Sequence, residues 1–342
     1  MKIRTKKFIQ NNRFKSVKID SKYKNKLHII CLSKTSKKLF FLFFIILFSI
    51  IFLILLKYHY YSKKISQNIN NFDYANYQKE IITDEIFERC SLNLTRNEIF
   101  FINGIIQKHK SKKCLEIGVG KGGISVLILN AIKDMKNSFL VSLDLNNKLK
   151  EDPSKKIGYK VEKYFSNLSQ NWKLLMGEMP HKFLSKLNLK FNLAIIDTDH
   201  SMPGEVLNII EVMPFLEEEA IIILPHLITH MKNVYNKDID KNEIKKSSTS
   251  ILLMSSLVGK KKIFYNENKI MGNVGAIFLE KNQEKYYENY FLLLLNIWES
   301  MLSDEQIFQF RLFIEKYYKK EKYINLFENA ILYNKEYHKN YK

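Results

Sequence analysis

Short apolar segments alternate with helical segments through the middle of the chain, and this pattern limits the possible folds. Five of them are predicted strands: Lys113–Ile117, Phe139–Asp144, Trp172–Met176, Phe191–Asp197 and Ala220–Leu224. Two more, Lys262–Tyr265 and Val274–Leu279, are predicted to close the same sheet. Apolar strands separated by helices are typical of a parallel sheet covered on both faces. The sequence therefore predicts an α/β fold with a doubly wound, mostly parallel, seven-stranded Rossmann-like sheet.

The first predicted strand runs into a turn rich in glycine, which an apolar helix over Ile124–Ile132 follows. The acidic and glycine positions at this junction are Glu116, Gly118, Gly120 and Gly122. Glycine permits positive φ and the close approach of a ligand, and a helix N-terminus offers unpaired N–H groups. The segment therefore fits an adenosine-type cofactor. Because Gly118-x-Gly120-x-x-Gly123 also satisfies the dinucleotide pattern, the turn alone leaves the cofactor open.

Polar residues follow the carboxyl end of all five central strands. In chain order they are Glu116, Asp144, Glu178, the group Asp197, Asp199, His200 and Ser201, and finally His226 with His230. Ligands of open parallel sheets bind beyond these strand ends. Asp144 is placed to accept hydrogen bonds from a ribose, which both NAD and S-adenosylmethionine contain. The pattern predicts one binding site along this edge of the sheet.

Four segments resemble those of class I S-adenosylmethionine-dependent methyltransferases. The resemblance is greatest to the small-molecule and glycan O-methyltransferases that include cephalosporin-hydroxylase-like proteins. The matching segments are Leu115–Gly123, Asp197–Glu205, Val212–Leu216 with Ala220–Leu224, and Asn273–Leu279. The resemblance extends from about Glu80 to Glu280. It implies S-adenosylmethionine as the cofactor and O-methylation of a sugar or another small hydroxylated acceptor.

The resemblance also implies a role for each site residue. Glu116 and the glycines Gly118, Gly120 and Gly122 would shape the methionine end of the cofactor site. Asp144 would bind the ribose hydroxyls, and Glu178 would lie near the adenine. Asp197 would lie beside the methyl-transfer centre and His200 beside the acceptor. His200 and His226 are both candidates for the base, since histidine titrates near neutral pH.

The fifth strand departs from the pattern of the relatives. They commonly end this strand with His-Asp and use that Asp, with the Asp of strand four, to hold a divalent cation. This chain has Pro225-His226 instead. A histidine suits a hard cation poorly, so we assign no metal. A softer metal held by Asp197, His226 and His230 stays an alternative.

The segment Leu39–Leu56 is predicted to cross a membrane. Its 18 residues include one polar side chain, Ser49. As a helix it would span about 27 Å, close to the roughly 30 Å of a hydrocarbon core. A cleaved signal peptide is the alternative, but the flank Lys57–Tyr61 offers no small-residue cleavage site. We therefore expect an uncleaved, single-pass anchor.

A basic tail precedes this segment. Residues 1–38 hold 13 Lys and Arg and one acidic residue, within a chain whose net charge is +20. Because the tail adjoins an apolar segment, we expect it to contact anionic lipid headgroups rather than nucleic acid. The excess of lysine before the span predicts a cytoplasmic N-terminus and places the large domain across the membrane. A cytosolic cofactor would require the opposite placement, so the side of the domain stays open.

The chain divides into five predicted parts. They are the basic tail 1–38, the transmembrane helix 39–56, a stem 57–79, a Rossmann-like methyltransferase domain 80–282 and a helical C-terminal extension 283–342. One apolar stripe in the extension is predicted to pack on the domain or to form a homodimer contact. Its members are Tyr287, Tyr290, Phe291, Leu294, Leu295, Trp298 and Leu302.

Two other functions are compatible with the sequence. An NAD or nucleotide-sugar enzyme would use a Tyr-x-x-x-Lys pair, and Tyr159 and Lys163 have that spacing. A non-catalytic, membrane-tethered interaction module is the second alternative. The Pro225-His226 departure favours the latter.

Overall fold

The computed structural model describes residues 74–90, 92–227, 249–264 and 273–341. These residues belong to one folded unit, which spans Asn68–Lys342. No helix among them is both long enough and apolar enough to cross a membrane. The predicted anchor Leu39–Leu56, the basic tail and most of the stem lie outside the described residues.

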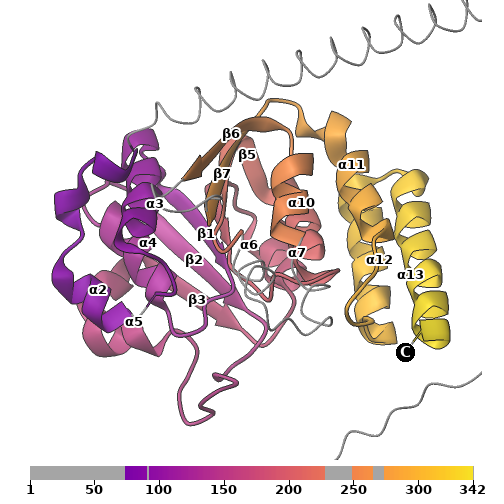
Figure 1. Ribbon diagram of the computed structural model, residues 1–342, viewed down its shortest axis with the longest axis horizontal. Coiled ribbons are helices and arrows are strands. Elements are labelled where there is room, and N and C mark those ends of the chain that lie inside the picture. The colour runs from indigo at the N-terminus through magenta and orange to yellow at the C-terminus, as the bar shows by residue number, and fades with distance from the viewer. Residues whose placement is uncertain (1–73, 91, 228–248, 265–272, 342) are drawn as a thin grey trace, which may run out of the picture. The chain divides into compact units, whose positions relative to one another are not determined.

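A seven-stranded sheet forms the centre of the fold, in the order β3-β2-β1-β4-β5-β7-β6 (Figure 1). The strands are β1 (Lys113–Ile117), β2 (Phe139–Asp144), β3 (Trp172–Met176), β4 (Phe191–Ile196), β5 (Leu216–Leu224), β6 (Gly259–Phe264) and β7 (Val274–Leu279). β7 is antiparallel to both β5 and β6, and β1 to β5 run parallel. The predicted mostly parallel seven-stranded sheet is therefore confirmed.

The predicted strand boundaries agree closely with the observed ones. β1, β2, β3 and β7 have the predicted bounds, and β4 ends one residue early. β5 begins at Leu216 rather than Ala220, because its acidic first half pairs with the start of β4 through Phe191. β6 begins at Gly259, and Tyr265 lies outside the described residues.

One face of the sheet is covered by helices from the first half of the unit (Figure 1). They are η2 (Tyr74–Asn76), η3 (Lys79–Ile81), α2 (Asp84–Cys90), α3 (Arg96–His109), α4 (Gly123–Ile132), α5 (Tyr159–Tyr164) and η4 (Ser166–Asn171). Thr95 and Glu98 form a capping box that starts α3. Every residue of α4 is buried, because this helix packs between α3 and the sheet.

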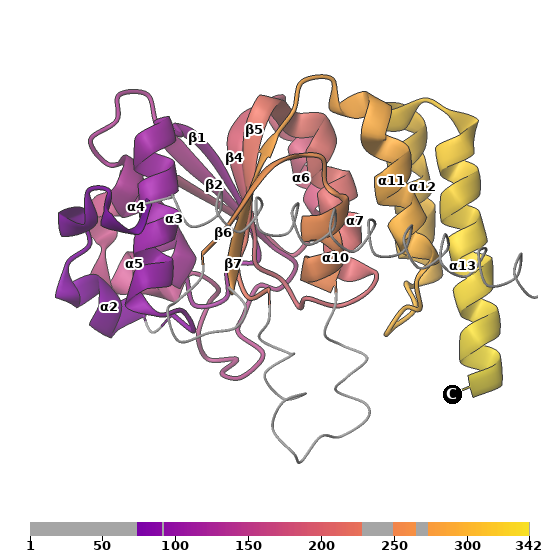
Figure 2. The same ribbon diagram turned by 45° about the horizontal axis from the view of Figure 1, so that its top comes forward.

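The other face is covered by later helices, and the helices of the C-terminal extension form a further layer outside them (Figure 2). They are α6 (Pro180–Leu187), α7 (Gly204–Val212), η5 (Met213–Phe215), α10 (Thr249–Ser256), η6 (Gln283–Tyr286), α11 (Tyr287–Leu292), η7 (Leu293–Leu295), α12 (Asp304–Tyr318) and α13 (Glu321–Tyr341). A single apolar cluster joins strand residues such as Ile196 and Ile222 to Phe310 of α12 and Phe327 of α13. The C-terminal extension therefore shares the core of the sheet.

Most of the predicted stripe packs inward, although it is not one continuous helix and Leu295 is 39% exposed. Tyr290, Phe291, Leu294 and Trp298 are fully buried. The Trp298 indole N–H donates to the Leu294 carbonyl at 2.7 Å, and Asn334 of α13 accepts from the Trp298 main-chain N–H at 2.7 Å. These bonds satisfy the polar atoms of a segment that follows η7 and is not helical.

Candidate active site

The strand order reverses between β1 and β4, since β1 pairs with β2 on one side and β4 on the other. Such a switch point opens a crevice at the carboxyl ends of the strands. A cavity of about 420 Å³ lies there. Its walls come from the glycine turn, the ends of β2 and β4, the starts of α6 and α7, and α12. The predicted site edge and the cavity therefore coincide.

The glycine turn is held between the neighbouring strands. Gly118 has φ of 86°, and its N–H donates to the Leu143 carbonyl at 2.9 Å. A Cβ on Gly118 would lie 2.0 Å from the Asp197 carbonyl oxygen, so only glycine fits. Gly120 has φ of 51° and no other atoms within 4 Å of a Cβ position, so it faces open space. Gly122 has φ of 90° and caps α4.

Asp144 lies at the end of β2 and borders the cavity, as predicted. Its Oδ2 atom accepts from the main-chain N–H groups of Val119 at 3.0 Å and Gly120 at 3.2 Å. Its Oδ1 atom accepts from the Asn146 N–H at 2.8 Å. One carboxylate therefore fixes the glycine turn and still faces the cavity.

Glu116 is fully buried against α4 and does not border the cavity. Its Oε2 atom accepts from the hydroxyls of Ser125 at 2.6 Å and Ser142 at 2.5 Å, and Oε1 has no partner among the described residues. Burial raises the pKa of Glu116 to about 8, even though the two serine hydrogen bonds lower it. The side chain supports the turn from behind rather than contacting the methionine end directly.

Glu178 points away from the cavity. It is exposed and pairs with Lys182 at 2.7 Å across one turn of α6. This lysine lowers the pKa of Glu178. The next two residues, Met179 and Pro180, border the cavity instead.

Asp197, His200 and His226 lie together after β4 and β5. Asp197 Oδ1 is 3.5 Å from His200 Nε2 and 3.8 Å from His226 Nε2, and the two imidazole rings are 5.5 Å apart. Of the three, only Asp197 borders the cavity. The three residues therefore lie together at the predicted edge of the sheet. The two histidines lie behind the Asp197 carboxylate, away from the cavity.

His200 is held between two acidic side chains. Its Nδ1 atom lies 3.2 Å from Glu205 Oε1, and the Ser250 hydroxyl donates to both oxygens of the same carboxylate. Burial alone would lower the pKa of His200, but the hydrogen bonds with Asp197 and Glu205 outweigh it and raise the pKa to about 10. His200 is therefore an imidazolium at neutral pH and accepts no proton there.

The described residues contain no cluster of three or more metal-binding side chains. Asp197 and His226 of the alternative metal site are described, whereas His230 is not. The Tyr159–Lys163 pair of the NAD alternative lies on α5, and neither residue borders the cavity.

Several residues that border the cavity were not predicted as site residues from the sequence. Leu302, Gln306 and Phe310 reach the cavity from the C-terminal extension, and Glu211 from α7. Only Glu211 could have been noticed, as an acid one helical turn after Asn208 in a mostly apolar helix. The others depend on how α12 packs.

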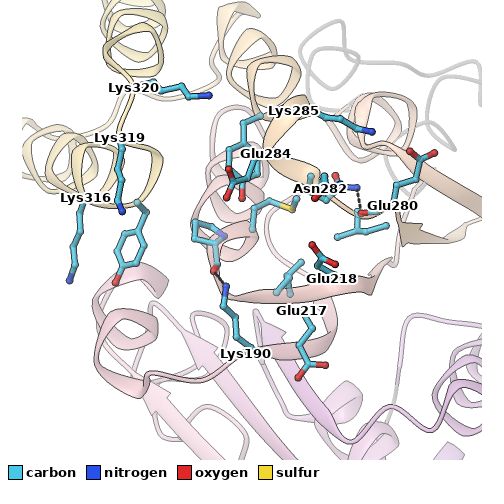
Figure 3. A pocket seen from close by; sticks show the side chains of 17 residues that line it. Lys190, Glu217, Glu218, Glu280, Asn282, Glu284, Lys285, Lys316, Lys319 and Lys320 are labelled. Carbon is cyan, nitrogen blue, oxygen red and sulfur yellow. Dashed lines mark hydrogen bonds between the residues drawn. The ribbon is translucent and has the colours of Figure 1, made fainter.

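A second cavity, of about 860 Å³, lies at the opposite edge of the sheet (Figure 3). Leu216 at the start of β5 and Leu279 at the end of antiparallel β7 border it. Both positively and negatively charged residues line it: Lys190, Lys285, Lys316, Lys319, Lys320, Glu217, Glu218, Glu280 and Glu284. None of the predicted site residues lies in it, so its size does not make it the active site.

We predict that Glu116 makes the protein less stable as pH rises from 4.5 to about 8. In this range the folded state keeps the carboxyl protonated and the unfolded chain does not, so rising pH favours unfolding. Glu116→Gln carries no titrating group, and its stability relative to wild type should rise across the range, by on the order of a few kcal/mol. Urea unfolding at pH 5 and pH 8 measures this.

Glu162→Gln is the control, because Glu162 is an exposed acid on α5. Its stability relative to wild type should be the same at both pH values. An equal response of the two variants would contradict the proposed titration of Glu116.

Comparison with known proteins finds a family model that matches the segment around this site. Residues 115–225 match a family model described as a methyltransferase domain. This segment contains the glycine turn, Asp144 and Asp197. No curated protein matches the chain.

Solved structures with a similar fold include three methyltransferases. They are the O-methyltransferase TomG from Streptomyces achromogenes in complex with SAM (10% identity, TM-score 0.43, 58% of this chain and 91% of that chain), an O-methyltransferase from Bacillus cereus in complex with SAH (13%, 0.43, 58% and 91%), and the SAH-bound Podospora anserina methyltransferase PaMTH1 (16%, 0.43, 58% and 89%). At these identities and TM-scores they carry no functional argument. Residues 115–225 match the methyltransferase domain model, and the predicted enzyme class, a methyltransferase, is confirmed.

Proposed function

We propose that the chain is a membrane-anchored S-adenosylmethionine-dependent O-methyltransferase that acts on a sugar or another small hydroxylated acceptor. One observation carries the enzyme part of this proposal. Gly118, Asp144 and Asp197 meet around a single cavity at the switch point of the sheet, within the segment that matches a methyltransferase domain. The resemblance of the sequence to glycan O-methyltransferases supports the choice of acceptor.

The residues around the cavity fit the cofactor. Gly120 has no Cβ and faces open space, which leaves room for the methionine end against the backbone. A carboxylate has about four acceptor positions, and three main-chain N–H groups occupy three of those on Asp144. The Asn146 side-chain amide donates to the fourth at 3.5 Å, a long hydrogen bond that a ribose hydroxyl could replace. When bound, S-adenosylmethionine supplies a methyl group already activated on a sulfonium sulfur.

The chain's own contribution to the chemistry is orientation and proton removal. The Asp197 carboxylate faces the cavity and accepts the proton of the acceptor hydroxyl as the new oxygen–carbon bond forms. His200, an imidazolium, lies 3.5 Å behind this carboxylate and holds its position. His226 lies 3.8 Å from the same oxygen, where it can take the proton onward.

The membrane part of the proposal rests on the sequence. The apolar segment Leu39–Leu56 would anchor the chain, and the basic tail before it would bind anionic lipid headgroups from the cytoplasmic side. An anchor would hold the cavity near lipid-linked glycans. The proposal also covers the identity of the acceptor and the side of the membrane on which the acceptor lies. It includes a homodimer formed through the C-terminal extension.

S-Adenosylhomocysteine, the demethylated product, should bind the full chain in a calorimetric titration. Asp144→Asn should weaken this binding at least about tenfold, because the amide cannot accept from all three N–H groups and a ribose hydroxyl. Asp152→Asn, on the same loop and bound to Ser154 and Lys155, is the matched control and should bind like wild type. A wild-type chain that binds neither the product nor S-adenosylmethionine would favour the non-catalytic interaction module.

Asp197→Asn should bind S-adenosylhomocysteine as wild type does but lose about 10²- to 10⁴-fold in turnover, because the amide accepts no proton. Transfer of a labelled methyl group to a panel of sugars and other hydroxylated molecules measures turnover. A variant as active as wild type would exclude Asp197 as the proton acceptor. Methylation of the other molecules but of no sugar would exclude the sugar as acceptor.

Membrane fractions test the anchor. If Leu39–Leu56 spans the bilayer, the full chain should stay with membranes through a wash in 1 M salt, on the order of what removes electrostatic binding. Release by salt would leave only the basic tail as the membrane contact. A reporter fused after Lys342 then shows which side the domain faces.

A further inference from the structure

A buried acidic side chain with no assigned role borders the cavity. Glu211 lies on α7, is 1% exposed, and faces the cavity together with Leu207 and Asn208 on the same side of that helix. Its Oε1 atom lies 2.6 Å from His181 Nδ1 and accepts from the His181 main-chain N–H at 3.3 Å. Glu211 is therefore bound to the first turn of α6.

The surroundings of His181 determine what Glu211 offers to the cavity. The imidazole ring packs against Phe310 and Phe313 at 5.5 and 5.3 Å, and its Nε2 atom has no partner among the described residues. A proton on Nε2 would leave a buried donor without a hydrogen-bond partner, so we assign the ring proton to Nδ1, which donates to Glu211. No described residue donates to Glu211 Oε2, so this oxygen is available to a group in the cavity.

The strand order shows which end of a nucleoside reaches Glu211. The glycine turn follows β1, Asp144 follows β2, and Met179 follows β3, the next strand along the edge. A cofactor with its methionine end at the turn and its ribose at Asp144 therefore directs its base toward the start of α6. Met179, Pro180 and Glu211 border the cavity there.

The walls at this end suit a flat base with one polar edge. Leu207 of α7, Phe310 of α12 and Pro180 of α6 are apolar. Glu178, which the family resemblance placed near the adenine, is exposed and paired with Lys182. Glu211 is thus the carboxylate that borders this part of the cavity.

We propose that Glu211 accepts a hydrogen bond from the exocyclic amine of the adenine and so makes the site selective for an adenine base. The inference rests on the proposed S-adenosylmethionine site and adds a specificity-determining residue to it. The C-terminal extension takes part through Phe310. This residue borders the cavity and packs against the His181 ring.

Calorimetric titration of the full chain with two ligands tests the inference. S-Adenosylhomocysteine carries the amine, and S-inosylhomocysteine carries a carbonyl oxygen in its place. Wild type should bind the adenosyl compound at least about tenfold more tightly, because the carbonyl would face a second acceptor. Glu211→Gln should bring the ratio of the two affinities to about one, since its amide also donates.

Glu178→Gln is the matched control, since it makes the same carboxylate-to-amide change at an acid outside the cavity and should keep the wild-type ratio. Loss of selectivity in Glu178→Gln but not in Glu211→Gln would overturn the proposal. If Glu211→Gln does not fold, as its melting curve would show, the wild-type ratio decides, and a ratio near one overturns the proposal. Failure of wild type to bind S-adenosylhomocysteine would instead overturn the proposed function itself.

Discussion

The close approach between Gly118 and the backbone of Asp197 is the contact on which the site depends. A side chain at position 118 would meet the Asp197 carbonyl oxygen at 2.0 Å. The Asp197 N–H also donates to the Ile117 carbonyl at 2.8 Å, so β1 and β4 stay paired up to the point where their chains diverge. The cofactor turn and the proposed proton acceptor are thereby fixed to each other by backbone alone.

Three acidic side chains lie around this contact, and each has a different environment. Glu116 is buried and protonated at neutral pH. Asp144 accepts from three main-chain N–H groups, and Asp197 lies beside the His200 imidazolium. The charges of Asp197 and Asp144 add to the effect of burial in raising the pKa of Glu116. The three different environments leave Asp197 as the carboxylate that can face an acceptor.

The sequence predicted the sheet well because strand periodicity and glycine turns are local signals. It placed Asp144 and Asp197 at the cavity because carboxyl ends of parallel strands meet at one edge. It did not predict where side chains point once they leave the strand. Glu178 comes one residue before the cavity wall, and its ion pair with Lys182 of α6 holds it on the surface. His200 has φ of 52°, a backbone conformation that sequence patterns do not reveal, and its ring lies behind Asp197.

The extension could not be predicted as part of the site, because its place depends on contacts between segments far apart in the chain. Tyr318 of α12 donates to the Ile210 carbonyl of α7 at 2.7 Å, across more than 100 residues. The same packing brings Phe310 against His181 and into the cavity wall. Residues beyond the matched segment 115–225 therefore complete the wall of the cavity, although the proposed catalytic and cofactor-binding residues all belong to that segment. A change in the packing of α12 would act on ligand binding through α7, without touching the glycine turn.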